Sequence, residues 1–241
     1  MDWETHRREA HALGRTQEFL KQIVYGGNDG IVTTFAVVAG FAGAQADGVA
    51  QIGGVAVLVF GLANLFADAV SMGLGEFLSM RSEHDLYRNR RASEMIEVEE
   101  DPDQERAELF QIMRQRGVPD GDADRLADLL IRHPQITSDL MMTYEFGMLD
   151  PDEENPVLSG LMTFMSFLTF GAIPLVPYFL LDPEPQTFWL SVGATVAALV
   201  ALGLLRWNAT GELMARTVGE TVLVGTVCAV VAYTVGAIVG G

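Results

Sequence analysis

Long apolar runs alternate with polar connections along this chain, and one polar segment is much longer than the rest. The apolar runs cover residues 31–43, 52–80, 157–181, 188–205 and 218–239. A helix needs about 20 apolar residues to cross the hydrocarbon core of a bilayer. The first run reaches that length only if its helix begins near Tyr25 and so includes Asn28 and Asp29. The pattern predicts an all-α, polytopic membrane protein with five transmembrane helices.

The long polar segment, residues 81–155, falls between the second and third predicted spans and has helix signals of its own. No Gly or Pro interrupts span two before Pro102, so its helix should continue to about Glu100. Asp101 as N-cap, Pro102 at the first helical position and Gln104 at the third form a helix start. The segment is therefore predicted to be a helical insert, with helices over Pro102–Arg116, Asp122–Arg132 and Thr137–Phe146.

Spans one and three carry residues that shape helix packing. Pro174 and Pro177 are expected to kink span three. Small residues four apart in span one make faces that can pack closely on another span or on a second copy of the chain, and they are Ala36, Gly40 and Ala44, with Ala39 and Gly43 beside them.

The charge of the chain indicates how it is oriented. A formal net charge of −17 beside 49% hydrophobic residues requires that acidic and apolar residues be segregated along the chain. Every Lys and Arg falls on one side of a five-span arrangement, since the connections AQADGVAQ and LDPEPQT contain neither. That side is cytosolic by the positive-inside rule. The N-terminus and the insert are therefore predicted in the cytosol, and the C-terminus on the far side of a cell membrane or vacuole-type membrane.

Glutamates in the insert fall in pairs at helical spacing. Glu94 and Glu97 are three residues apart, as are Glu105 and Glu108, and such pairs lie on one helix face, where like charges repel and a cation would relieve the repulsion. Carboxylates suit Mg²⁺, Ca²⁺ or Mn²⁺, and nearby thioethers shift the preference toward softer ions such as Fe²⁺. The alternative is a solvated acidic face with methionines in the helix core. A third candidate group adds such thioethers, and its members are Met141, Met142 and Glu145.

Polar residues also occur within the predicted spans. Span two carries Asn64, Asp68, Met72 and Glu76 at intervals of four, which gives one broad polar stripe. At a rise of ~1.5 Å per residue, Asp29 lies ~12 Å and Met72 ~13 Å from the cytosolic end of their spans, so the two can face each other. A carboxylate at membrane depth costs ~2.5–3.5 kcal/mol and therefore indicates function. The pattern predicts a divalent-metal path, with Asp68 nearer the midplane and Glu76 nearer the cytosolic mouth. Alternatively, Asp29 caps span one and Glu76 reaches toward the mouth.

These signals divide the chain into four regions: a cytosolic amphipathic N-terminal helix at 1–24, transmembrane helices 1 and 2 at 25–80, a cytosolic acidic metal-binding helical insert at 81–155, and transmembrane helices 3 to 5 at 156–241. The chain has no phosphate-binding loop, no Ser/His/Asp arrangement and no basic nucleic-acid face. It is therefore predicted to be neither an enzyme nor a nucleic-acid-binding protein. His84 and His133 lack zinc-like partner spacing and Cys228 is the single cysteine, so no permanently bound cofactor is expected.

Four segments resemble the vacuolar iron transporter family, in collinear order over almost the whole chain: NDGIVTTFAVVAGFAGA, DAVSMGLGEFLSMRSEHD, MMTYEFGM and GAIPLVPYFL. The resemblance implies a homodimer of five-span subunits that exchanges cytosolic Fe²⁺, and often Mn²⁺, for protons. It implies that Asp29 and Met72 lie on the translocation path, and that the insert binds metal. This chain departs from the plant members at two positions. They have an acidic residue where this chain has Asn64, and a small residue where it has Asp68. The implied metal ligands are Glu94, Glu97, Glu105, Glu108, Glu145, Met141 and Met142.

These patterns together predict a transporter that exports divalent iron, manganese or both from the cytosol as a metal/proton antiporter. The expected partners are divalent metal ions, protons, the lipid bilayer and a second copy of the chain, and Fe²⁺ or Mn²⁺ is the transported ion. The alternative is a membrane-anchored metal sensor or buffer, which binds metal in its insert without translocating it.

Overall fold

The described part of the chain is all helical. The computed structural model describes residue 6 and residues 15–44, 50–151, 155–182 and 184–240, and within these ranges it contains helices and connections but no strand. The predicted N-terminal helix lies outside the described residues at 1–5 and 7–14, while α2 (Arg15–Glu18) covers part of its end. The chain divides into two compact units, one made of Met1–Phe77 with Val157–Gly241 and the other of Leu78–Pro156. The predicted all-α class is confirmed.

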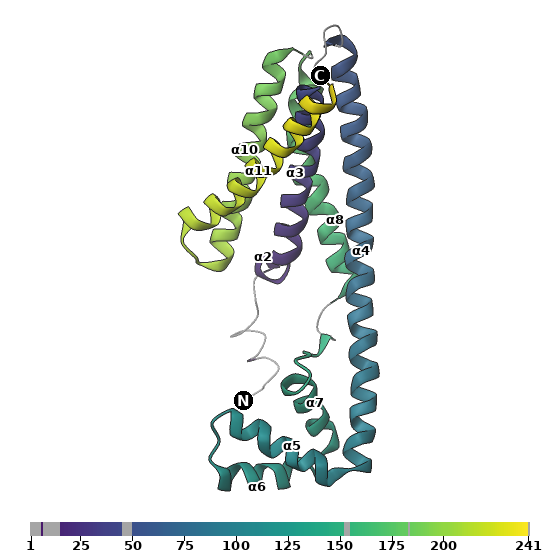
Figure 1. The fold of residues 1–241 in the computed structure, drawn as a ribbon, viewed down its shortest axis with the longest axis vertical. Helices are drawn as coiled ribbons and strands as arrows, with labels where there is room; N and C mark the ends of the chain where they lie inside the picture. The colour runs from purple at the N-terminus through teal and green to yellow at the C-terminus, as the bar shows by residue number, and fades with distance from the viewer. Residues whose placement is uncertain (1–5, 7–14, 45–49, 152–154, 183, 241) are drawn as a thin grey trace. The chain divides into compact units, whose positions relative to one another are not determined.

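The first unit is a bundle of apolar helices (Figure 1). Within it, α3 packs on both α10 and α11, and these two also pack on each other. The described helices that contribute to this unit are α2, α3 (Leu20–Gly43), the first part of α4 (Ala50–Glu100), α8 (Pro156–Ala172), the 3₁₀ helix η2 (Ile173–Leu175), α9 (Val176–Leu180), α10 (Pro185–Thr210) and α11 (Met214–Gly240).

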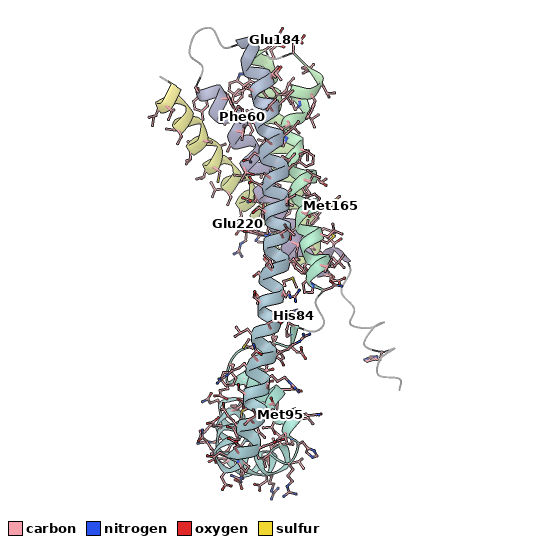
Figure 2. All side chains as sticks on the ribbon, turned by 90° about the vertical axis from the view of Figure 1, so that its right-hand side faces the viewer. Phe60, His84, Met95, Met165, Glu184 and Glu220 are labelled. Atoms are coloured by element: carbon pink, nitrogen blue, oxygen red, sulfur yellow. The ribbon has the colours of Figure 1, made fainter. Side chains whose placement is uncertain are left out.

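Four helices in the described ranges are long and apolar enough to cross a membrane. Large apolar side chains remain exposed on them, among them Phe60 on α4 and Met165 on α8 (Figure 2). Water does not favour such a surface, whereas lipid covers it at no penalty. The chain is therefore a multi-pass membrane protein. The four segments are Gly54–Glu100, Pro156–Leu180, Gln186–Thr210 and Met214–Val239.

The helix α3 does not meet the same requirement, so the predicted count of five spans is not confirmed. It has 24 residues and begins at Leu20, earlier than the predicted start near Tyr25. Asn28 and Asp29 lie within it and lower its hydropathy. The fifth span stays a prediction, supported by the packing of α3 among the apolar helices.

Glycines let α3 approach its neighbours backbone to backbone. A Cβ atom at Gly30 would collide with the carbonyl oxygen of Phe167 in α8, and one at Gly43 with the carbonyl oxygen of Tyr233 in α11. At the α11 side the contact is reciprocal, because a Cβ at Gly236 would meet the backbone of Gly40. The small-residue face predicted in span one therefore packs against another helix of the same chain. Close approach of this kind is typical of helix pairs in membranes.

The prolines of span three interrupt its helix as predicted. The α-helix α8 ends at Ala172, a 3₁₀ turn follows over Ile173–Leu175, and α9 begins at Val176. The freed backbone is satisfied by a side chain, because Ser191 Oγ of α10 donates a hydrogen bond to the carbonyl of Pro174 at 2.6 Å. This bond also fixes α10 against the kink.

The second unit contains the rest of α4 and three shorter helices: α5 (Pro102–Gln115), α6 (Asp120–Leu130) and α7 (Pro134–Tyr144). The predicted helix start is confirmed, because the Asp101 side chain accepts from the backbone N–H of Gln104 at 3.3 Å. The helix predicted over Thr137–Phe146 starts earlier than expected, because α7 begins at Pro134. Proline is favoured at the first helical position, where its missing N–H is not needed.

Candidate functional site

The centre of the insert is a pair of buried glutamates. Glu94 of α4 is 1% exposed and Glu105 of α5 is 3% exposed, and their side chains are hydrogen-bonded to each other. Burial, followed by repulsion from Glu94 and Glu108, raises the pKa of Glu105 to about 8. Burial and repulsion from Glu145 also raise the pKa of Glu94. The two carboxyl groups therefore share a proton at neutral pH, with Glu105 as the donor, since two adjacent buried carboxylates cannot both ionise easily.

The other predicted glutamates lie around this pair. Burial, then repulsion from Glu108, raises the pKa of Glu145, and Glu97 repels both Glu94 and Glu145. Glu108 accepts a hydrogen bond from Gln104 Nε2 at 3.1 Å. The glutamates of the three sequence groups thus lie within electrostatic reach of one another, on α4, on α5 and at the end of α7.

This cluster is not arranged as a closed metal site. Across the described ranges, no three His, Cys, Asp or Glu side chains converge closely enough to hold an ion. One oxygen of each central carboxyl, Glu94 Oε1 and Glu105 Oε2, is buried and has no hydrogen-bond partner among the described residues. These two oxygens are acceptors available to a cation. Ligation by the five glutamates stays a prediction.

The two methionines are fully buried in the insert. Met141 packs with Leu109 and Ala127 in its apolar core, and Met142 is also 0% exposed. This contact supports the packing interpretation of Met141 that the sequence left open. A thioether contribution from either methionine to metal binding stays a prediction.

Two arginines that the sequence analysis did not single out hold the segment around Glu145. The Arg90 guanidinium lies 4.1 Å from the centre of the Phe146 ring, and that of Arg116 lies 4.0 Å from the Tyr144 ring. Such cation–π contacts contribute about 0.5–1 kcal/mol at exposed sites. Arg90 also carries a positive charge near both Glu94 and Glu145. The aromatic residues on either side of Glu145, Tyr144 and Phe146, were the only sequence signal that could have pointed to these cation–π contacts.

In the membrane unit, Asp29 is half-buried and lines an open cavity of about 830 Å³. The carboxylates of Asp29 and Asp68 lie within electrostatic reach of each other across α3 and α4. Asn64 Nδ2 donates a hydrogen bond to Asp68 Oδ2 at 2.8 Å. Of the predicted polar stripe of span two, Asp68 is therefore the residue that interacts electrostatically with Asp29. The hydrogen bond from Asn64 orients the Asp68 carboxylate.

Glu76 is held by α3. Gln22 Nε2 donates to Glu76 Oε1 at 3.1 Å, and Lys21 Nζ lies 4.0 Å from the same oxygen. This carboxylate is thus engaged by two partners in the structure. Met72 packs against the apolar cluster that contains Phe35 and Phe167. The predicted facing of Asp29 and Met72 is not tested by these contacts and stays a prediction.

The structure defines a multi-pass membrane protein. Its apolar helical bundle carries carboxylates on two neighbouring helices and is joined to an acidic insert, and carboxylates of this kind attract cations. The sequence pattern of the VIT family matches residues 20–237, and the chain belongs to that family. It is 33% identical to vacuolar iron transporter 1 of Oryza sativa subsp. japonica over 228 residues, which cover 95% of this chain and 87% of the relative.

Two further relatives agree. The chain is 31% identical to vacuolar iron transporter 1 of Arabidopsis thaliana, over 97% of this chain and 90% of the relative. It is 32% identical to the vacuolar iron transporter of Toxoplasma gondii, over 92% of this chain and 75% of the relative. The family resemblance seen in the sequence is confirmed. Because the relatives are named as transporters, the family is not one of enzymes, as the sequence predicted.

Proposed function

We propose that this protein exports divalent iron, manganese or both from the cytosol in exchange for protons. The observation that carries the proposal is membership of a family whose relatives are named vacuolar iron transporters. The electrostatic interaction between Asp29 and Asp68 in the membrane helices supports it. Cytosolic export follows from the orientation predicted by the basic residues. The homodimer implied by the resemblance is part of the proposal.

The insert would collect the metal. A divalent cation that binds Glu94 and Glu105 takes the place of their shared proton, since metal ligands must be deprotonated. The cation also removes the mutual repulsion of the surrounding glutamates. Oxygen donors of this kind suit Mn²⁺ and accommodate Fe²⁺. Metal capture in the insert is therefore coupled to proton release into the cytosol.

The membrane step would use Asp29. A carboxylate that binds metal in one state and a proton in another couples the two fluxes, because both compete for the same charge. Asp68, oriented by Asn64, would accept the ion or the proton next. Met72 would add a thioether on the path, and Glu76 would receive the ion at the mouth after leaving Gln22 and Lys21.

Transport by the purified full-length chain tests this proposal. In proteoliposomes that contain a pH dye, Fe²⁺ uptake should be accompanied by proton movement in the opposite direction. Asp29→Ala should abolish the flux and leave metal binding by the insert unchanged. Asp85→Asn, which alters an exposed carboxylate of α4, is the matched control and should transport normally.

A membrane-anchored buffer or sensor would give a different result. The native chain would then bind metal without flux, and Asp29→Ala would change nothing. Metal uptake with no opposing proton movement would retain the transporter and remove the antiport.

A further inference from the structure

A second carboxylate, Glu220 of α11, lines the same cavity as Asp29. The cavity lies within the membrane unit and is bounded by residues of α3, α10 and α11. Four charged side chains line it: Lys21 and Asp29 from α3, Arg206 from α10, and Glu220. Figure 2 labels Glu220 on α11. Glu220 lies outside the family motifs quoted above and outside the acidic insert, so neither explains why a carboxylate is present here.

Glu220 is engaged through both of its oxygens. Arg206 Nη1 lies 3.0 Å from Glu220 Oε2, and Arg216 Nε donates to Glu220 Oε1 at 3.0 Å. Arginine stays protonated at any physiological pH, so these positive charges are permanent. The Arg206 side chain is 34% exposed and that of Glu220 43%, so water and dissolved salt screen the interaction between their charges.

The four charges that line the cavity balance, and two more lie just outside the lining: Glu76 is 4.0 Å from Lys21, and Arg216 is paired with Glu220. Lys21 and Arg206 contribute two positive charges, and Asp29 and Glu220 contribute two negative ones. Without the Glu220 charge the lining would be net positive, and Arg216 would also lose its partner. A divalent cation that approaches Asp29 feels each of these charges twice as strongly as a monovalent ion does. Charged clefts change local ion concentration by about 10-fold to 10³-fold.

We propose that Glu220 sets cation access to Asp29, by neutralising Arg206 at the wall of the cavity. Glu220 is a positioning residue that acts through the charge of Arg206 and does not need to ligate the metal. The inference rests on the proposed function, because it takes Asp29 as the residue that receives the ion.

A double-mutant cycle that neutralises Glu220 and Arg206 separates this role from others. The experiment measures Fe²⁺ uptake by the full-length chain in proteoliposomes, with Fe²⁺ kept reduced, for Glu220→Gln, Arg206→Gln and the double variant. Glu220→Gln should raise KM about tenfold at low ionic strength with kcat unchanged, and the difference should shrink to less than about threefold at high salt. Arg206→Gln should lower KM, and the double variant should return to near the native value.

Controls keep the result interpretable. Glu212→Gln removes a carboxylate that lies near Arg216 but does not line the cavity, and it should leave KM unchanged. Glu220→Asp keeps the charge and should stay within about threefold of the native KM, which tests the idea even if Glu220→Gln does not fold.

Two outcomes would overturn the inference. A double variant as impaired as Glu220→Gln would mean that Glu220 acts as a ligand or only as a structural link. A Glu220→Gln variant with native KM would mean that its charge does not matter. Both presuppose a native chain that transports Fe²⁺, whereas a native chain without flux would instead refute the proposed function.

Discussion

Replacing Glu105 by glutamine should remove most of the pH dependence of metal binding by the insert. In the native chain Glu105 is buried beside Glu94 and has a pKa raised to about 8. A metal ion must displace the proton before it can use that carboxylate. Glutamine keeps the shape and can still donate to Glu94, but it has no proton to lose.

The size of the effect follows from the pKa. At pH 7 roughly nine in ten molecules carry the proton on a group with pKa about 8. Between pH 8 and pH 6 the apparent metal affinity of the native chain should therefore fall about 50-fold. In Glu105→Gln the same change of pH should alter affinity much less, because the group with the pKa of about 8 is gone. The variant should bind more weakly than the native chain at pH 8, because one oxygen ligand is lost.

Calorimetric titration of the full-length chain with Mn²⁺ measures both quantities. Titrations in two buffers of different ionisation enthalpy give the number of protons released, about one per metal at pH 7 for the native chain and close to none for the variant. Glu99→Gln, which changes an exposed glutamate of α4, is the matched control and should keep the native pH profile. An unchanged profile in Glu105→Gln would refute the shared proton as the group that metal displaces.

Two further predictions concern stability. A folded-state pKa raised above the unfolded value stabilises the fold below the unfolded value, and that contribution is lost as pH rises through the folded value. Without metal, the insert should therefore lose thermal stability as the pH rises from about 5 to 8. At pH 8.5 the Glu105→Gln variant should melt at a higher temperature than the native chain, and a lower melting temperature of the variant would count against the buried pair. Gly43→Leu should destabilise the membrane unit by about 1–3 kcal/mol, because its side chain would collide with the backbone of Tyr233. Gly40→Ala, whose added Cβ meets open space, should melt within a few degrees of the native chain. Equal losses of stability in the two variants would contradict the packing argument.

Helix boundaries were largely predictable because they depend on short stretches of sequence. Asp101 caps α5 through its own side chain, and the prolines of span three interrupt the helix by removing N–H donors. The start of α7 was misplaced because Pro134 can begin a helix as well as end one. The apolar runs predicted the membrane class, but the polar Asn28-Asp29 pair leaves α3 below the usual hydropathy of a span.

Partners across helices were harder to predict. Spacing along one helix placed Glu76 at the cytosolic mouth, yet its contact with Gln22 depends on how α3 and α4 pack. Likewise, helical spacing grouped Met141 with Glu145, while the packing of α7 turns Met141 into the apolar core. Rotation of one helix about its axis decides such contacts, and a single sequence does not specify that rotation.

A pair of mutually repelling carboxylates occurs both in the insert and in the membrane helices, although these are separate units. Glu94 with Glu105 in the insert, and Asp29 with Asp68 in the membrane, each bring two carboxylates from different helices close enough to repel. A single positive charge relieves that repulsion, and either a proton or a metal ion can supply it. A pair of this kind therefore exchanges one for the other without requiring any other chemistry. Removing one carboxylate of a pair removes that repulsion, so the remaining carboxylate should bind a cation more weakly and release much less proton when it does so near neutral pH.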